Sequence, residues 1–131
     1  MKTFDWSVRV YYEDTDSAGI VYYANYLRFI ERARTEWLRQ QGIELDVLAE
    51  SHQIYFVVQS VQADYKMPAR FNDLLVVKSR LLFQGKASLK MEQIVYNQAA
   101  QKCCIAVVKL ACVDCLSLRP KRFPNTIFQD I

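Results

Sequence analysis

Residues 11–34, YYEDTDSAGIVYYANYLRFIERAR, decide how this chain folds and what chemistry it can carry. Two acids, Asp14 and Asp16, follow an apolar strand, and Gly19 comes soon after them. An amphipathic helix begins a few residues later, with Asn25 predicted as its N-cap. The amino end of a helix presents free N–H groups and partial positive charge, which stabilise a developing anion. A carboxylate beside such an anion site is the minimum apparatus for hydrolysing an acyl bond.

The composition predicts one soluble domain covering residues 1–131. Apolar residues make up 52% of the chain, enough for a core without metal or disulfides. The longest apolar run falls well short of the roughly 20 residues that a membrane helix needs. Lys2 is followed by Asp5 rather than by an apolar block, so we expect no signal peptide and a cytoplasmic protein. A net charge of +3 without a basic stripe argues against a nucleic-acid role.

The cysteines are predicted to be small buried residues in a reducing compartment. Cys112 and Cys115 have a spacing found in metal and redox sites. However, Cys103 and Cys104 are adjacent, and the only histidine, His52, offers no second ligand pair. We therefore expect no metal site. A lone histidine without a partner acid is usually solvated, so His52 is not expected to be catalytic.

One long helix and a series of strands are expected from the hydrophobic periodicity. The helical period covers residues 26–41, and Gly42 is predicted to follow its last turn. A short second helix is expected around residues 45–50. Strands with a period of two are expected at residues 4–12, 54–64, 74–83, 88–96 and 103–114.

This order of elements predicts an α+β fold, a curved antiparallel sheet of about five strands wrapped around one long central helix. The short breaks at residues 84–86 and 97–101 predict hairpins and therefore antiparallel neighbours. The strand at 103–114 is the most apolar, which makes it the candidate for sheet-edge pairing between subunits. In the strand at 74–83, one face is expected to carry Leu75, Val77, Ser79, Leu81 and Phe83.

A long motif runs from the first strand through the loop into the helix. It has the form Tyr-x-Asp-x-Asp-x-x-Gly-x-Val-x-x-x-x-Tyr, followed by Glu-x-Ala-Arg, and it resembles the hotdog-fold acyl-CoA thioesterases. Within these it is most similar to the 4-hydroxybenzoyl-CoA thioesterase family and its YbgC-like branch. The matching positions are Tyr12, Asp14, Asp16, Gly19, Val21, Tyr26, Glu31, Ala33 and Arg34. The likeness extends over nearly the whole chain, to Arg119-Pro120 and Pro124.

The resemblance implies a hotdog fold, hydrolysis of an acyl-CoA thioester and active sites at the interfaces of a homodimer or homotetramer. Asp16 corresponds to the family's catalytic carboxylate. The backbone N–H at Tyr23 corresponds to the donor that polarises the thioester carbonyl, although many YbgC-like members have histidine there. Asp16 can activate a water as general base or attack the carbonyl itself. Coenzyme A is part of the substrate, and no cofactor is expected.

The remaining loop and helix residues are expected to shape the loop, line a pocket or serve a structural role. Gly19 lets the loop backbone approach the substrate, and Asp14 is predicted to hold the loop through N–H groups. Tyr22 and Tyr26, with Tyr23, can line an acyl pocket or serve as core aromatics. Glu31 is expected to be structural, in part through pairing with Arg34.

Two basic areas are candidates for binding the phosphates and pantetheine of coenzyme A. They are Lys86 with Ser88, and Arg119 with Lys121. The alternative interpretation of each is a solvated basic face. By loose resemblance, both areas correspond to phosphate or pantetheine contacts in the family.

Two other functions compete with thioester hydrolysis. A hotdog dehydratase needs a histidine near the long helix, and His52 is not placed there. The second alternative is a weakly catalytic or non-catalytic protein that binds acyl thioesters or acyl carrier protein as a partner of envelope or phospholipid machinery. Acyl carrier protein is a potential partner under either function, because its acidic surface suits a basic groove rim. The sequence does not determine the acyl chain or its carrier.

Overall fold

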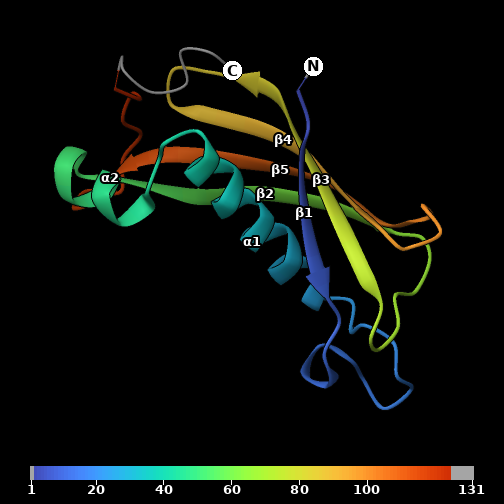
Figure 1. Ribbon diagram of the computed structural model, residues 1–131. Coiled ribbons are helices and arrows are strands. Elements are labelled where there is room, and N and C mark those ends of the chain that lie inside the picture. Colours follow the sequence, from blue (N-terminus) through green and yellow to red (C-terminus); the bar gives the residue numbers. More distant parts are fainter. Residues whose placement is uncertain (1, 125–131) are drawn as a thin grey trace.

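A single five-stranded antiparallel sheet curls around one long helix in the computed structural model, which describes residues 2–124 (Figure 1). The strands lie in the order β1-β3-β4-β5-β2. This arrangement confirms the predicted α+β class and the wrapped helix. In chain order the elements are β1 (Phe4–Arg9), the 3-10 helix η1 (Tyr12–Asp14), α1 (Asn25–Gln40), α2 (Leu45–His52), β2 (Ile54–Tyr65), β3 (Leu74–Gln84), β4 (Ser88–Tyr96) and β5 (Lys102–Asp114).

Helix α1 lies against the concave face of the sheet, where it packs on β1, β3 and β4. Its buried side chains recur every three or four residues, which places them on one side of the helix. They are Asn25, Tyr26, Phe29, Ile30, Ala33, Arg34, Trp37 and Leu38. Opposite them the sheet contributes the alternate residues of β3, β4 and β5, among them Leu75, Val77, Leu89, Met91, Val95 and Val108. The shared core therefore fixes the position of the helix, and with it the position of the helix amino end.

Helix α1 ends at its carboxyl end with Gly42 as the first residue after the cap, as the sequence predicts. Gly42 has a φ of +83°, a left-handed conformation that glycine adopts without strain. The Gly42 N–H donates to the Arg39 carbonyl at 2.9 Å, and the Ile43 N–H donates to the Leu38 carbonyl at 2.9 Å. These two bonds form a Schellman motif, which satisfies carbonyls that the end of the helix leaves free.

One polar cluster interrupts the apolar contact between α1 and the sheet. Arg34 is buried, and its guanidinium donates to Gln93 Oε1 at 3.1 Å. The Gln93 amide in turn donates to the Ile30 carbonyl at 2.8 Å and to Ser79 Oγ at 3.0 Å. Burial lowers the pKa of Arg34. Gln93 therefore links the helix to β3 and gives the buried cation an acceptor.

The position of β5 differs from the prediction. β5 lies inside the sheet, with β4 on one side and β2 on the other, so it cannot pair with a second subunit. Its apolar sequence reflects burial inside the sheet rather than an interface. The free edge on this side is β2, whose side chains are mostly exposed although many are apolar. Val57, Val58 and Val61 are 40%, 49% and 40% exposed.

Two strand predictions were wrong because of local irregularities. Phe83 does not share the inner face of β3, because the register shifts between Leu81 and Phe83 and turns Phe83 outward opposite Lys90. The first strand ends at Arg9 rather than at Tyr12, because Tyr12 begins the 3-10 helix η1.

The four cysteines are free thiols, and the predicted burial holds for three of them, Cys103, Cys104 and Cys112. Burial raises the pKa of Cys104 and that of Cys112 to about 11. Cys115 is half-buried. Among residues 2–124, no helix is both long and apolar enough to span a membrane.

Replacing Gln93 with alanine should lower the free energy of unfolding by about 2–4 kcal/mol, because it opens a cavity and leaves buried Arg34 without its acceptor. Urea denaturation measures this change. Gln98→Ala, at an exposed position in the β4–β5 turn, is the matched control and should change stability by less than about 0.5 kcal/mol. Equal stability of the two variants would contradict a structural role for Gln93.

Candidate active site

The buried carboxylate of Asp14 organises the loop between β1 and α1. Its Oδ2 accepts a hydrogen bond from the Tyr11 N–H at 2.8 Å, and its Oδ1 accepts one from the Asn25 side chain at 2.9 Å. The Asp14 carbonyl also accepts from the Tyr22 N–H at 3.1 Å. Both sides of the loop are thus tied to one residue. The prediction that Asp14 holds the loop through N–H groups is confirmed.

Asn25 does not cap the helix as predicted. Ala24 occupies the N-cap position without a side-chain bond, and Asn25 is the first helical residue. The Asn25 side chain turns back to Asp14, so it cannot reach the helix amides. Within the described residues, the backbone N–H groups of Tyr23 and Ala24 have no acceptor. The start of α1 therefore offers two free amide donors, which is the requirement for an oxyanion site.

Asp16 is exposed on the same loop and points its carboxylate toward solvent-accessible space. One oxygen, Oδ1, accepts from the Ala18 N–H at 2.8 Å, which forms a local turn. No donor among residues 2–124 bonds its Oδ2. The Asp16 backbone is fixed by a bond from its N–H to the Ile20 carbonyl at 2.9 Å. One carboxylate oxygen is therefore held in place, and the other is free to act on a ligand.

Gly19 shapes the turn that follows Asp16. Its φ of +75° is a left-handed conformation, and a Cβ added there would meet no atom within 4 Å. Glycine is thus required by the backbone angle rather than by crowding within the chain. The Gly19 carbonyl accepts from the Phe71 N–H at 3.0 Å, and the Val21 N–H donates to the Ala69 carbonyl at 2.8 Å. These bonds anchor the Asp16 loop to the segment before β3.

Asp16 and the start of α1 border the same cavity. This cavity has a volume of 280 Å³. Its lining residues are Glu13, Thr15, Asp16, Tyr22, Ala24, Asn25 and Arg28. Arg28 supplies the single positive charge of this lining, opposite two acids. A carboxylate, the first residues of the helix and a cation thus border one cavity, whereas Tyr23 lines a second cavity.

A second, aromatic cavity of 250 Å³ lies on the other side of the helix start. The rings of Tyr23, Tyr26 and Tyr65 surround it, with the Tyr26 and Tyr65 centroids 5.7 Å apart. Tyr26 is almost fully buried, and its hydroxyl accepts from the Ala69 N–H at 3.0 Å. Burial raises the pKa of Tyr26 to about 12. Tyr26 is therefore both a core residue and part of the cavity wall, whereas half-exposed Tyr22 faces the Asp16 cavity.

The predicted coenzyme A residues lie far from Asp16 within one chain. The Val10 N–H bonds the Asp73 carbonyl, so the end of β1 and the Asp16 loop sit at the start of β3. Lys86 and Ser88 follow the other end of β3, whose 11 residues span about 33 Å at the usual rise of a strand. The structure therefore does not bring these basic residues together with Asp16.

The tail residues lie beside the start of β2, at the same far end. The Lys121 ammonium donates to the His52 carbonyl at 2.8 Å and lies 3.6 Å from an Asp114 oxygen. The Arg119 side chain is exposed. Lys121 thus supports the tail in the described structure, and Arg119 is the freer of the two cations.

Two other predicted residues, Glu31 and His52, are placed away from the two cavities. Glu31 is exposed on α1 and accepts from the Thr35 hydroxyl at 3.0 Å, in keeping with a structural role. The described ion pairs do not include Glu31 with Arg34. His52 is exposed at the end of α2. Among residues 2–124, no three histidine, cysteine, aspartate or glutamate side chains gather closely enough to hold a metal ion.

Sequence reasoning missed the residues that β2 and its following loop contribute. Tyr65, Lys66 and Met67 line the aromatic cavity together with Tyr23. They lie about forty positions further along the chain, and only the sheet order brings them to the helix start. The sequence signal that was available is the alternation of β2, which places Tyr65 on the same face as Ala63.

The family model of the Thioesterase-like superfamily matches residues 10–131. The chain therefore belongs to the Thioesterase-like superfamily. Among curated relatives, acyl-CoA thioesterase YbgC of Haemophilus influenzae is 41% identical over 95% of this chain and 90% of that protein. Acyl-CoA thioester hydrolase YbgC of Escherichia coli O6:H1 is 39% identical over 95% of this chain and 92% of that protein. The predicted membership in the YbgC-like thioester hydrolases is confirmed.

Solved structures agree with this assignment. A probable thioesterase from Bartonella henselae superposes with a TM-score of 0.88 and 34% identity, covering 94% of this chain and all of that one. The DHNA-CoA thioesterase of Staphylococcus aureus reaches a TM-score of 0.87 at 20% identity, over 93% of this chain and 81% of that one. The second likeness shows the shared fold. Together they confirm the predicted hotdog fold.

Replacing Asp14 with alanine should lower the free energy of unfolding by about 2–4 kcal/mol, since it leaves the buried Asn25 amide and the part-buried Tyr11 N–H without an acceptor. Chemical denaturation measures the loss. Glu13→Ala, at the exposed neighbouring acid, is the control and should leave stability nearly unchanged. A stable Asp14→Ala variant would show that the loop is held by other contacts.

Proposed function

We propose that this protein hydrolyses acyl-CoA thioesters, with Asp16 as the catalytic carboxylate and the helix start as the oxyanion site. One observation carries the proposal: the free carboxylate oxygen of Asp16 borders the same cavity as the beginning of α1, where two amides have no acceptor. Membership in the thioesterase-like family and the acyl-CoA activity of the YbgC relatives support it.

The chemistry needs an oxygen nucleophile and stabilisation of negative charge on the thioester oxygen. In the general-base route, Asp16 removes a proton from water while the water oxygen attacks the acyl carbon. The carbonyl oxygen becomes an oxyanion, which the Tyr23 N–H and the neighbouring Ala24 N–H stabilise. The C–S bond then breaks, and the thiolate of coenzyme A leaves and takes up a proton. No resident cofactor is needed for these steps.

A covalent route uses the same residues in a different order. The Asp16 carboxylate attacks the acyl carbon, the thiolate leaves, and a mixed anhydride forms that water then hydrolyses. Rapid-quench mass spectrometry distinguishes the routes, because only the second produces an acyl adduct on Asp16.

The aromatic cavity is the natural place for the acyl group. It adjoins the helix start, and its walls are Tyr23, Tyr26 and Tyr65, with Met67 at the rim. Apolar and aromatic walls favour an acyl group over water. Tyr22 lines the Asp16 cavity, and Gly19 shapes the loop that carries Asp16. Hydrolysis of short, long and aromatic acyl-CoAs, beside acyl-carrier-protein thioesters, will define the preferred acyl group and carrier.

Assembly into a homo-oligomer through β2 accounts for the distance between Asp16 and the basic residues. β2 is an exposed apolar edge strand of 12 residues, and such edges pair with another strand. Antiparallel pairing of two β2 strands places the start of one beside the end of the other. The start adjoins Lys121 and the tail, and the end carries Tyr65 at the acyl cavity. Lys86, Ser88, Arg119 and Lys121 of one subunit then approach the thioester site of its partner.

Replacing Asp16 with asparagine should reduce kcat for acyl-CoA hydrolysis by about 100-fold or more, because the amide cannot take a proton or attack. Thiol release measures the rate, and circular dichroism confirms the fold. Glu13→Gln removes a carboxylate from the same cavity and should keep nearly the wild-type rate. An Asp16→Asn enzyme with unchanged rates on every acyl-CoA would remove Asp16 from the mechanism.

Replacing Val61 with lysine should convert the oligomer to monomers and abolish most hydrolysis, since it places a charge in the β2 edge. Light scattering after gel filtration measures the mass. Val47→Lys, at a valine of α2 that is 52% exposed, is the matched control and should keep both mass and activity. A monomeric wild-type protein with full activity would contradict the shared site.

A further inference from the structure

The aromatic cavity at the start of α1 has one cationic side chain in its lining. Its walls are the rings of Tyr23, Tyr26 and Tyr65 together with apolar side chains, and Lys66 lies among them. No aspartate or glutamate of residues 2–124 lines this cavity, whereas two acids line the Asp16 cavity. Lys66 is therefore a lone positive charge beside apolar walls.

The backbone on both sides of Lys66 is anchored to the core. The Lys66 N–H donates to the Cys103 carbonyl at 2.9 Å, directly after Tyr65 at the end of β2. Further along, the Ala69 N–H donates to the Tyr26 hydroxyl at 3.0 Å. The place of Lys66 at the cavity is thus fixed, while its flexible four-carbon stem lets the ammonium group reach a ligand.

Lys66 takes part in none of the ion pairs found among residues 2–124. Asp64 lies two positions before it on β2 without pairing with it. The Lys66 side chain is exposed, and apolar walls beside it keep water from one side of a bound ligand. An ion pair is stronger in such surroundings than in bulk water. The structure therefore leaves Lys66 available for an anionic group of the ligand.

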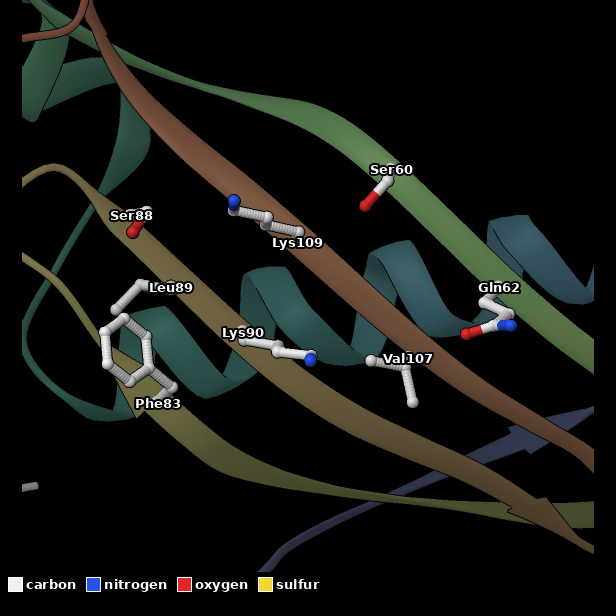
Figure 2. Close-up of a pocket in the computed structure, with 8 residues that line it drawn as sticks. All are labelled: Ser60, Gln62, Phe83, Ser88, Leu89, Lys90, Val107 and Lys109. Atoms are coloured by element: carbon white, nitrogen blue, oxygen red, sulfur yellow. The ribbon is translucent and has the colours of Figure 1, made fainter.

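The phosphates of coenzyme A have other cations to bind. Their proposed contacts lie at the opposite end of the sheet from Asp16 within one chain. A polar groove of 480 Å³ begins at the same end, and Figure 2 shows it on the sheet face turned away from α1, with Ser88, Lys90 and Lys109 in its lining. Because Ser88 is one of the proposed contacts, this groove is grouped with the coenzyme A side of the thioester. A charge at the aromatic cavity instead meets the acyl side.

We propose that Lys66 selects acyl groups that carry a carboxylate at the end remote from the thioester, as in monothioesters of dicarboxylic acids. This inference rests on the proposed function, which places the acyl group in the aromatic cavity. The thioester carbonyl lies at the Tyr23 and Ala24 amides, and the methylene chain packs along the rings. The terminal carboxylate accepts a charge-assisted hydrogen bond from the Lys66 ammonium. A neutral acyl group of equal length makes the apolar contacts only.

Hydrolysis of adipyl-CoA and hexanoyl-CoA by the full chain tests this inference, because the two acyl groups have the same number of carbons and differ in the terminal carboxylate. Replacing Lys66 with methionine should lower kcat/KM for adipyl-CoA by about three- to tenfold, since the carboxylate loses its charged partner. The value for hexanoyl-CoA should stay within about twofold of the wild-type value. Lys66→Glu should lower the adipyl-CoA value further, because it places two like charges together.

Lys102→Met is the matched control. It removes an exposed cation next to Cys103 on β5 that does not line the aromatic cavity, and it should keep the wild-type ratio of the two rates. An unchanged adipyl-CoA rate in Lys66→Met, or an equal loss with both thioesters, would overturn the role of Lys66 and leave the proposed function intact. A wild-type protein that hydrolyses neither these nor other acyl-CoAs would overturn the proposed function, and this inference with it.

Discussion

The Asp14 carboxylate is the interaction on which the geometry of the site depends. It is buried, and it binds a backbone amide before the loop and a side-chain amide at the start of α1. A buried carboxylate needs such donors, because an unsatisfied charge in the interior is costly. By binding both ends of the loop, Asp14 keeps Asn25 away from the helix amides. The same contact therefore leaves the Tyr23 and Ala24 amides without a side-chain cap.

The core of the sheet supplies the rigid support for this loop. The apolar face of α1 is fixed against β3 and β4, and the Arg34–Gln93 cluster ties the helix to the sheet at one further point. A helix held in this way cannot slide, so its amino end stays where the loop presents Asp16. Preorganised donors of this kind stabilise charge without moving during the reaction.

The sequence predicts the bounds of the helices and strands well. It predicts the order of the strands in the sheet less well. Periodicity places α1 and the four later strands within one or two residues, because each pattern depends only on local burial. Sheet order is a global property, and the apolar sequence of β5 is equally compatible with an interface and with the interior. The Phe83 bulge and the turn of Asn25 toward Asp14 arise from contacts that no local pattern contains. Tyr65 and Met67 reach the aromatic cavity only because β2 runs back along the sheet to α1.

The burial of the cysteines has a consequence for an enzyme whose product is a thiol. Thiolates, not neutral thiols, exchange with disulfides. Cys104 and Cys112 are withdrawn from solvent and keep their protons, with pKa values of about 11. Coenzyme A released during turnover, or its oxidised form, therefore finds no reactive partner at these two positions. The enzyme is protected there from being trapped as a mixed disulfide with its own product.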